Sequence, residues 1–388
     1  MNDGGTPTPA IGYLHYDEDL AAWPAAEDAL IADMIEALRK NNEHQYDKSK
    51  KNRRLWRNGK PHAVRDAHSK SCAILRGELT VRADLPVQYR QGMFAEPGRT
   101  YPVIARISTT SGAIRSDQVR GVRGLGLKVL GVHSPSGRRA CDRFSADANQ
   151  DFVFVTEPVF LFRDAAHYAG AGMRTAKLLS HLPDAGMMFL NRVLRGARRV
   201  ATLAGRQLPR NLRVFADPNY HVLGQTFYTA APIRFGAYVA KLSVSPASKA
   251  VTDLISTTIP RHDPEALAKV VKDHFRSNGA DYVVSAQLCT NTDDMPIEDA
   301  TVEWSEADSP YQPVAVIHYP PQTAHSDALA HFGDDELTFN SWRGIDEHRP
   351  LGSINRLKLR VYEESSIFRH EANGAEYLEP ADLSAFPQ

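Results

Sequence analysis

Cysteine is scarce in this sequence. The three cysteines, Cys72, Cys141 and Cys289, are far apart, and no two of them form a CxxC pair. Three widely spaced thiols provide neither a disulfide framework nor a cysteine-based metal site. We therefore expect a reducing compartment. The N-terminal stretch has early acidic residues and no apolar segment typical of a secretory signal, so we predict a cytoplasmic protein.

An excess of charge of one sign is also missing, because Lys plus Arg and Asp plus Glu both number 46. A formal charge of zero argues against a global attraction to nucleic acid or to an anionic membrane. No run of about 18 apolar residues occurs, so stable membrane insertion is not expected. Any electrostatic function of this chain has to be local.

Several sequence signatures of function are absent, among them internal repeats, low-complexity tracts, an HExxH zinc motif and an acyl-transfer triad. The stretch GVRGLGLK (121–128) has spaced glycines but lacks the strand, turn and helix order of a dinucleotide site, so we interpret them as turn residues. What remains is a globular chain of 388 residues, 42% of them hydrophobic, which is enough for a sizeable core.

Eight segments have the composition and alternation of β-strands. They form two groups of four around a helical stretch at 173–215, and short connections within each group favour antiparallel pairing. Eight antiparallel strands can close into a barrel that leaves no unpaired edge. We therefore predict an α+β fold with an eight-stranded antiparallel β-barrel and surrounding helices. The segments are 72–83, 101–108, 124–132, 150–156, 221–230, 237–246, 281–289 and 313–320.

Helical periodicity is present near 26–45, within 173–215, at 264–279 and at 354–373. No linker divides the chain, so we predict an N-terminal arm at 1–20 and a single domain at 21–388. The arginines from Arg192 to Arg213 form either a patch for anionic lipid or substrate carboxylates, or a solvated helix face.

The predicted helix INRLKLRVYEESSIFRHEAN (354–373) places one tyrosine between cations. Lys358, Tyr362 and Arg369 are four and seven residues apart, so they lie on roughly one side of the helix. Nearby cations favour a phenolate and lower the tyrosine pKa, which makes the oxygen a hard anionic ligand. The alternative is a surface helix with a packed ring and solvated basic residues.

Three further stretches carry polar residues beside strands. In VRDAHSKSCAILRGELTV, His68 precedes an apolar strand and Arg65 lies three residues upstream. In YPVIARISTTSG, alternation places Arg106 and Ser108 on one face. In QDFVFVTEPVFLFRDAAHY, an apolar strand runs into a proline and an Arg-Asp pair. A lone histidine proves little, because most such histidines are surface or satisfied core residues.

Taken together and in this order, the stretches resemble the heme catalase family, particularly its short branch of catalase-related peroxidases. The resemblance rests on RDAHSKSCAILRGELTV, RIS, VRGVRGLGLKV, EPVFLFRDAAHY and the Tyr-to-Arg spacing of seven, and it spans about residues 60–370. MPIEDATVEW, LTFNSW and EHRPLGSINR are similar to landmarks of the short branch. The resemblance implies a catalase-like barrel with heme between the barrel and a proximal helix, which agrees with the strand count.

The resemblance also implies heme b as cofactor, with Tyr362 as the fifth ligand of its iron. The family has an arginine four residues before this tyrosine, where this chain has Lys358, with Arg360 close by. Further cofactor contacts are implied at the positions of the propionate partners and of an aromatic residue that packs on heme. These positions are Arg65, Arg106 and Arg369, and Tyr168.

On the opposite side of heme, His68 matches the general acid and base, and Ser108 matches the residue that holds its tautomer. The distal asparagine of the family is replaced by Val155, with Thr156 next to it. A valine cannot hydrogen-bond peroxide, and the loss of one donor lowers catalase turnover by a factor of ~10² or more.

The implied function is a heme-dependent peroxidase that reduces hydrogen peroxide or organic hydroperoxides through a ferryl intermediate, with weak catalase activity at most. Two alternatives stay open: a fatty-acid hydroperoxide isomerase or lyase, and a non-catalytic heme-binding protein. The implied partners are a small-molecule peroxide or lipid hydroperoxide, an external electron donor and further copies of the chain in a homo-oligomer.

Overall fold

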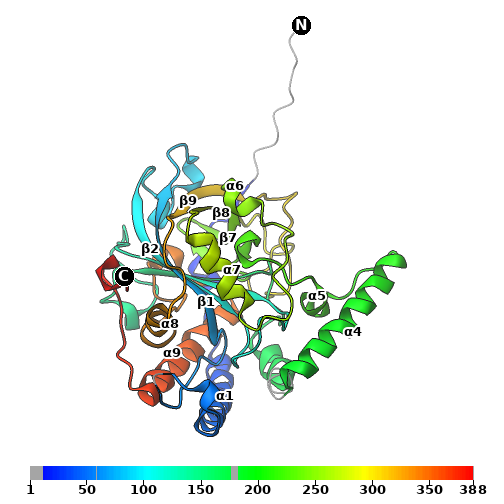
Figure 1. Ribbon diagram of the computed structural model, residues 1–388. Coiled ribbons are helices and arrows are strands. Elements are labelled where there is room, and N and C mark those ends of the chain that lie inside the picture. The colour runs from blue at the N-terminus through cyan, green and yellow to red at the C-terminus, as the bar shows by residue number, and fades with distance from the viewer. Residues whose placement is uncertain (1–11, 58, 176–181, 388) are drawn as a thin grey trace.

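The computed structural model describes residues 12–57, 59–175 and 182–387. Within them, nine strands form one antiparallel sheet in the order β5-β4-β3-β2-β1-β9-β8-β7-β6, and β5 also pairs with β7. This last pairing closes all strands except β6 into an eight-stranded barrel (Figure 1), which confirms the predicted fold. The strands are β1 (Lys70–Val81), β2 (Thr100–Thr109), β3 (Arg123–Val129), β4 (Gln150–Val155), β5 (Phe227–Tyr228), β6 (Ile233–Phe235), β7 (Tyr238–Pro246), β8 (Ala280–Leu288) and β9 (Gln312–Tyr319).

The predicted strand at 221–230 is mostly a turn. His221 accepts a hydrogen bond at Nδ1 from the backbone N–H of Leu223, and a one-turn helix (Val222–Gly224) precedes the short β5. A Cβ at Gly224 would lie 2.5 Å from the backbone of Leu254, so the close approach of a second segment favours glycine there. The short hairpin strand β6 was not predicted from the sequence.

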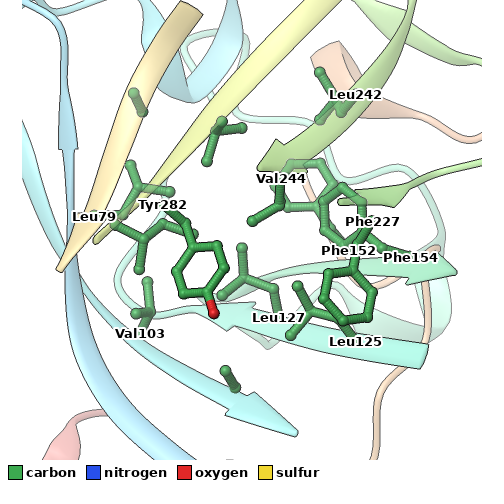
Figure 2. Packing of buried hydrophobic residues seen from close by; sticks show 14 of the residues in the cluster. Leu79, Val103, Leu125, Leu127, Phe152, Phe154, Phe227, Leu242, Val244 and Tyr282 are labelled. Carbon is green, nitrogen blue, oxygen red and sulfur yellow. The ribbon is translucent and has the colours of Figure 1, made fainter. Parts of the chain in front are cut away.

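The barrel strands separate apolar from polar side chains by simple alternation. Leu125 and Leu127 of β3 point into the barrel, where they pack with residues from several other strands, including Phe152 and Phe154 of β4 (Figure 2). On the other face of the same strands, Arg106 and Ser108 of β2 are paired with Gly126 and Gly124 of β3. This second face carries the polar residues of the candidate site.

The helices lie outside the barrel (Figure 1). Helices α9 and α1 pack together, and Arg356 of α9 donates from Nε to Glu27 of α1 at 2.6 Å. The predicted helices at 26–45, 264–279 and 354–373 correspond to α1, α7 and α9, whereas residues 176–181 of the helical stretch lie outside the described residues. The α-helices are α1 (Ala25–Lys51), α2 (Ala165–His167), α4 (Asp184–Leu203), α5 (Arg210–Ala216), α6 (Lys249–Thr252), α7 (Ala266–Phe275), α8 (Asp327–His331) and α9 (Ser353–Asn373).

The described part of the predicted N-terminal arm lies on the barrel. The backbone N–H of Leu14 donates to the carbonyl of Cys289, and the backbone N–H of Tyr16 donates to the carbonyl of Ala237. Residues 1–11 of the arm lie outside the described residues, so its separation from a domain at 21–388 stays a prediction. Over the part of the chain that the structure covers, no helix has the length and apolar content needed to cross a membrane.

Candidate active site

His68 and Tyr362, from distant parts of the chain, line the same cavity. It lies between the outer face of β2 and β3 and helix α9, and its empty space of about 590 Å³ includes part that is open to solvent. The predicted site residues that line the cavity are Arg65, His68, Arg106, Ser108, Tyr362 and Arg369. Other predicted residues, all within the described ranges, are not part of its lining: Val155, Thr156, Tyr168, Lys358 and Arg360.

His68 is held in an uncommon backbone conformation. Its φ of 59° lies in the left-handed region, which residues other than glycine rarely adopt. Arg106 Nη2 donates to the His68 carbonyl at 2.6 Å, and the imidazole Nδ1 lies 3.1 Å from Ser108 Oγ. Burial, reinforced by nearby cations, lowers the His68 pKa from 6.5 to about 3. The imidazole is therefore neutral, with one nitrogen free to accept a proton.

Gly124 makes room for this imidazole. A Cβ at Gly124 would lie 2.2 Å from Cε1 of His68 and 2.4 Å from Nδ1. Val155 is paired with Gly124 across β3 and β4, so its side chain points to the same face of the sheet as the imidazole. The side chain that β4 presents on this face, opposite Gly124, is therefore a hydrocarbon.

Tyr362 lies in a less positive environment than the sequence predicts. Burial raises the pKa of its phenol above the ordinary value, and Asp66 and Tyr168 act in the same direction. Arg65 is the cation that lowers the Tyr362 pKa, and its effect is smaller than the raising effect of burial. The predicted lowering is therefore wrong, because burial disfavours the phenolate. Burial also raises the pKa of Tyr168 to about 12, and its ring packs edge-on against Phe162 at 5.3 Å between centroids.

Arg106 has a carboxylate partner of its own. Its Nε and Nη2 lie 2.9 and 2.8 Å from Asp334 Oδ1, and Arg57 contacts the other oxygen of Asp334 at 3.1 Å. Since Arg106 also holds the His68 carbonyl, its main observed role is to connect that backbone to a buried acid.

Arg65 and Arg369 differ from Arg106 because neither forms an ion pair with a described residue. Arg65 donates to the carbonyls of Gly333 and Leu337, at 3.0 and 2.7 Å, and Arg369 donates to the Leu337 carbonyl at 3.2 Å. The Nε atoms of both arginines are buried without a hydrogen-bond partner. Burial lowers both pKa values, that of Arg369 to about 10. Two buried guanidinium groups therefore face the cavity without a carboxylate in ion-pair contact, and only the more distant charges of Asp334 and Asp335 act on both.

The remaining predicted residues contact other groups. Lys358 Nζ donates to Asn355 Oδ1 at 3.3 Å, and burial lowers the Lys358 pKa to about 8. Thr156 Oγ1 accepts from the backbone N–H of Arg123, so it supports the strand pair. Arg360 Nε is buried without a hydrogen-bond partner.

Several cavity or near-cavity residues were missed in the sequence. Asp66 lies two residues before His68 in the chain, accepts from Ser365 Oγ at 2.8 Å, and has a pKa raised by burial. Gly124, Asp334 and Phe339 were missed as well. The spaced glycines of β3 were visible, but their interpretation as turn residues is wrong, because both lie within the strand. Asp334 carried no signal, since its partner Arg106 is 228 residues away in the chain.

Comparison with known proteins gives a structural likeness without a sequence match. No protein-family model matches the chain, and no curated protein sequence matches it. Solved structures of catalases share its fold. They include a fungal catalase (TM-score 0.54, 15% identity, 80% of this chain and 60% of that one), a bacterial catalase (0.52, 18%, 85% and 61%) and catalase A from Saccharomyces cerevisiae (0.53, 16%, 82% and 66%).

The chain therefore spans less than two thirds of each of these catalases. At such low identity the likeness concerns the arrangement of the backbone, and the barrel closed through β5 and β7 is what the proteins have in common. The protein has a catalase-like fold.

Proposed function

We propose that the protein is a heme-dependent peroxidase that reduces hydrogen peroxide or organic hydroperoxides, with weak catalase activity at most. One observation carries the proposal: His68 and Tyr362 line the same cavity as Arg65 and Arg369, two buried cations without an anionic partner. Solved structures of catalases share the fold, which supports the same assignment.

The residues present fit a heme. Two propionate carboxylates need buried, charged hydrogen-bond donors, and the unpaired Nε atoms of Arg65 and Arg369 supply them. Tyr362 would donate its oxygen to the iron. A metal cation reverses the effect of burial on a nearby phenol, because it stabilises the deprotonated oxygen directly. When bound, the heme iron supplies the redox chemistry that cleaves the peroxide O–O bond.

His68 would move the proton in this reaction. With its lowered pKa it is neutral and accepts a proton from the peroxide hydroxyl, then returns that proton to the departing oxygen, which leaves as water or an alcohol. Ser108 determines which nitrogen does this: when Nδ1–H donates to Ser108 Oγ, the lone pair of Nε2 is available. Arg106 keeps the ring in place through the backbone carbonyl.

A fatty-acid hydroperoxide isomerase or lyase is the second candidate. It is favoured by the apolar character of the cavity wall, where Val153 and Phe339 line the space. Val155, on the same face of the sheet as the imidazole, stands where the family resemblance implies a hydrogen-bonding asparagine. Such a wall accommodates a lipid chain but offers few groups to orient a second hydrogen peroxide molecule. This reaction rearranges the substrate and consumes no electron donor.

The test is to purify the protein with heme and to assay hydrogen peroxide and a fatty-acid hydroperoxide, each with and without a reducing dye. Dye oxidation that falls by about 10²-fold or more in the His68→Ala variant supports the peroxidase. A rearranged product formed without dye identifies the isomerase or lyase. Stoichiometric heme binding without peroxide turnover would instead identify a non-catalytic heme-binding protein.

The Tyr362→Phe variant tests the iron ligand separately. The hydroxyl is the only group removed, so loss of heme from the purified protein, or a changed ferric absorption spectrum, assigns the ligand. An unchanged spectrum would rule out Tyr362 as the ligand. A chain that binds no heme at all would refute the proposed function.

A further inference from the structure

Helix α4 is amphipathic and carries its apolar side toward solvent. It extends away from the barrel at the right of Figure 1, with α5 between it and the barrel. Phe189, Val193 and Val200 are spaced four and seven residues apart and therefore lie on one face. Their exposed fractions are 65%, 50% and 68%, and Leu203 at the end of the helix is 90% exposed. An apolar stripe on this scale is uncommon for an exposed helix.

A row of arginines borders this stripe. Arg192, Arg195 and Arg199 follow one another at spacings of three and four, and Arg192 and Arg199 are exposed. Asp184, at the start of the helix, is the single acidic residue in α4. The chain as a whole has no net charge, so this concentration of positive charge is a local property of the helix.

Helix α4 is held on the protein by the side opposite its apolar stripe. Asn191 Nδ2 donates to the Phe215 carbonyl at 2.9 Å, Arg198 forms an ion pair with Asp217 at 2.6 Å, and Met187 is buried. Polar anchors on one side and unpaired apolar side chains on the other indicate that the stripe is oriented outward by the fold.

We propose that α4 binds the surface of a membrane that contains anionic phospholipid. A helix with an apolar stripe bordered by arginines lies in the plane of such a surface, with the stripe about 5–10 Å deep among headgroups and acyl chains. Twenty residues correspond to a contact about 30 Å long. The arginine row meets the negative headgroups, and the helix does not cross the bilayer.

Charge favours a membrane over a second copy of the chain as the occupant. In a symmetric dimer the same surface is used twice, so arginines at the border of one stripe would approach those of the other without acidic partners on α4. An anionic lipid surface provides the missing negative charge. The inference is independent of the proposed heme chemistry, because it depends on α4 alone.

The experiment is flotation of the full chain with vesicles of phosphatidylcholine and with vesicles that also contain phosphatidylglycerol. We expect binding to the mixed vesicles that weakens as salt is raised. The double variant Arg192→Gln/Arg199→Gln should bind roughly 25-fold more weakly, since each arginine near an anionic surface contributes about fivefold. The Phe189→Ser variant should lose about tenfold or more.

Val87→Ser and Ile255→Ser serve as matched controls, because these apolar side chains are 75% and 51% exposed and lie outside α4. They should bind as the unaltered protein does. The Phe189→Trp variant gives a second readout, a blue shift of its fluorescence on addition of mixed vesicles. Circular dichroism checks that each variant is folded.

Three results would overturn the inference. The first is no binding to the mixed vesicles. The second is nonspecific binding, in which the α4 variants bind as well as the unaltered protein or phosphatidylcholine vesicles bind as well as the mixed ones. The third is self-association, measured by light scattering, that Phe189→Ser abolishes while vesicles are not bound, which would make the stripe an interface between copies.

Discussion

His68 shows how several residues act together to place one imidazole. Its left-handed backbone is stabilised by the bond from Arg106 to its carbonyl, and Arg106 is held in turn by the buried Asp334. Ser108 then sets the tautomer. Because each group is positioned by the next, the proton-transfer nitrogen needs little reorganisation before it reacts.

Val155 is the residue at which we expect a single substitution to change the catalase activity. Asparagine at this position would add a hydrogen-bond donor on the face of the sheet that carries the imidazole. We predict that Val155→Asn increases oxygen release from hydrogen peroxide by about tenfold or more, as expected for one well-placed donor. An oxygen electrode with the heme-loaded protein measures this rate.

The control for this substitution is Val155→Ala, which changes the volume without adding a donor. Equal rates for the two variants would mean that space, and not hydrogen bonding, limits the release of oxygen.

At the scale of the element, β3 forms the wall of the cavity because two of its residues lack side chains. Gly124 faces His68, and a Cβ at Gly126 would lie 2.8 Å from the ring of Phe339. A strand with ordinary side chains at these positions would occupy the space in which the imidazole and the phenyl ring lie. The glycines therefore shape the cavity and do not mark a turn.

We predict that Gly124→Ala moves the imidazole and breaks its contact with Ser108, since the added carbon would lie 2.4 Å from Nδ1. Peroxidase activity should fall to within about tenfold of the His68→Ala variant, because both lose a positioned base. Heme content should be unchanged. The measurements are steady-state dye oxidation and the ratio of heme to protein.

Gly121→Ala is the matched control, because its Cβ would meet nothing closer than a carbon of Phe215 at 3.9 Å. If both alanine variants retain full activity, the contact between β3 and the imidazole has no role in positioning it.

At the scale of the whole molecule, buried ion pairs connect segments from both halves of the chain. Asp151 of β4 has two cationic partners. Its Oδ1 lies 2.7 Å from Nζ of Lys128 in β3, and its Oδ2 lies 2.8 Å from Nη1 of Arg343, a residue of the segment before α9. Lys128 also contacts Glu379 near the C-terminus at 2.7 Å. These pairs hold the last segments of the chain against the barrel, close to the helix that carries Tyr362.

We predict that Asp151→Ala lowers the free energy of unfolding by about 3–5 kcal/mol, because it leaves two cations buried with fewer partners. Urea denaturation measures the change. Asp84→Ala is the control, since its ion pair with Arg82 is exposed to solvent and should contribute little to stability. A loss of similar size in both variants would show that the buried pairs contribute no more than surface pairs.

Buried histidines should make the protein sensitive to acid. Burial lowers the pKa of His68 to about 3 and those of His221 and His348 to about 4. The unfolded chain binds protons below about pH 6.5, whereas these folded imidazoles do not, so stability is complete above pH 6.5 and is lost as the pH falls toward 4. Each histidine contributes a slope of at most about 1.4 kcal/mol per pH unit.

The measurement is urea denaturation between pH 7 and pH 5. His348→Gln should reduce the slope with pH, and His133→Gln, at an exposed position, should leave it unchanged. A slope that is the same in both variants would exclude His348 as a source of the acid sensitivity.

Much of this architecture was predictable because strand and helix patterns are local. The alternation around Arg106 and Ser108 and the helical spacing from Lys358 to Arg369 were read within single segments, and both elements are present. The short β6 and the turn before β5 were not predicted, because contacts with other segments, such as that between Gly224 and Leu254, shape them.

The amino-acid order alone was therefore enough to predict the eight-stranded barrel, the main helices and six of the seventeen residues that line the cavity. It could not reveal that Asp334 pairs with Arg106, that Gly124 makes room for His68, or that burial makes Tyr362 a weaker acid. Those facts depend on distances between residues far apart in the chain and on exclusion of water, and both arise only when the barrel and α9 pack together.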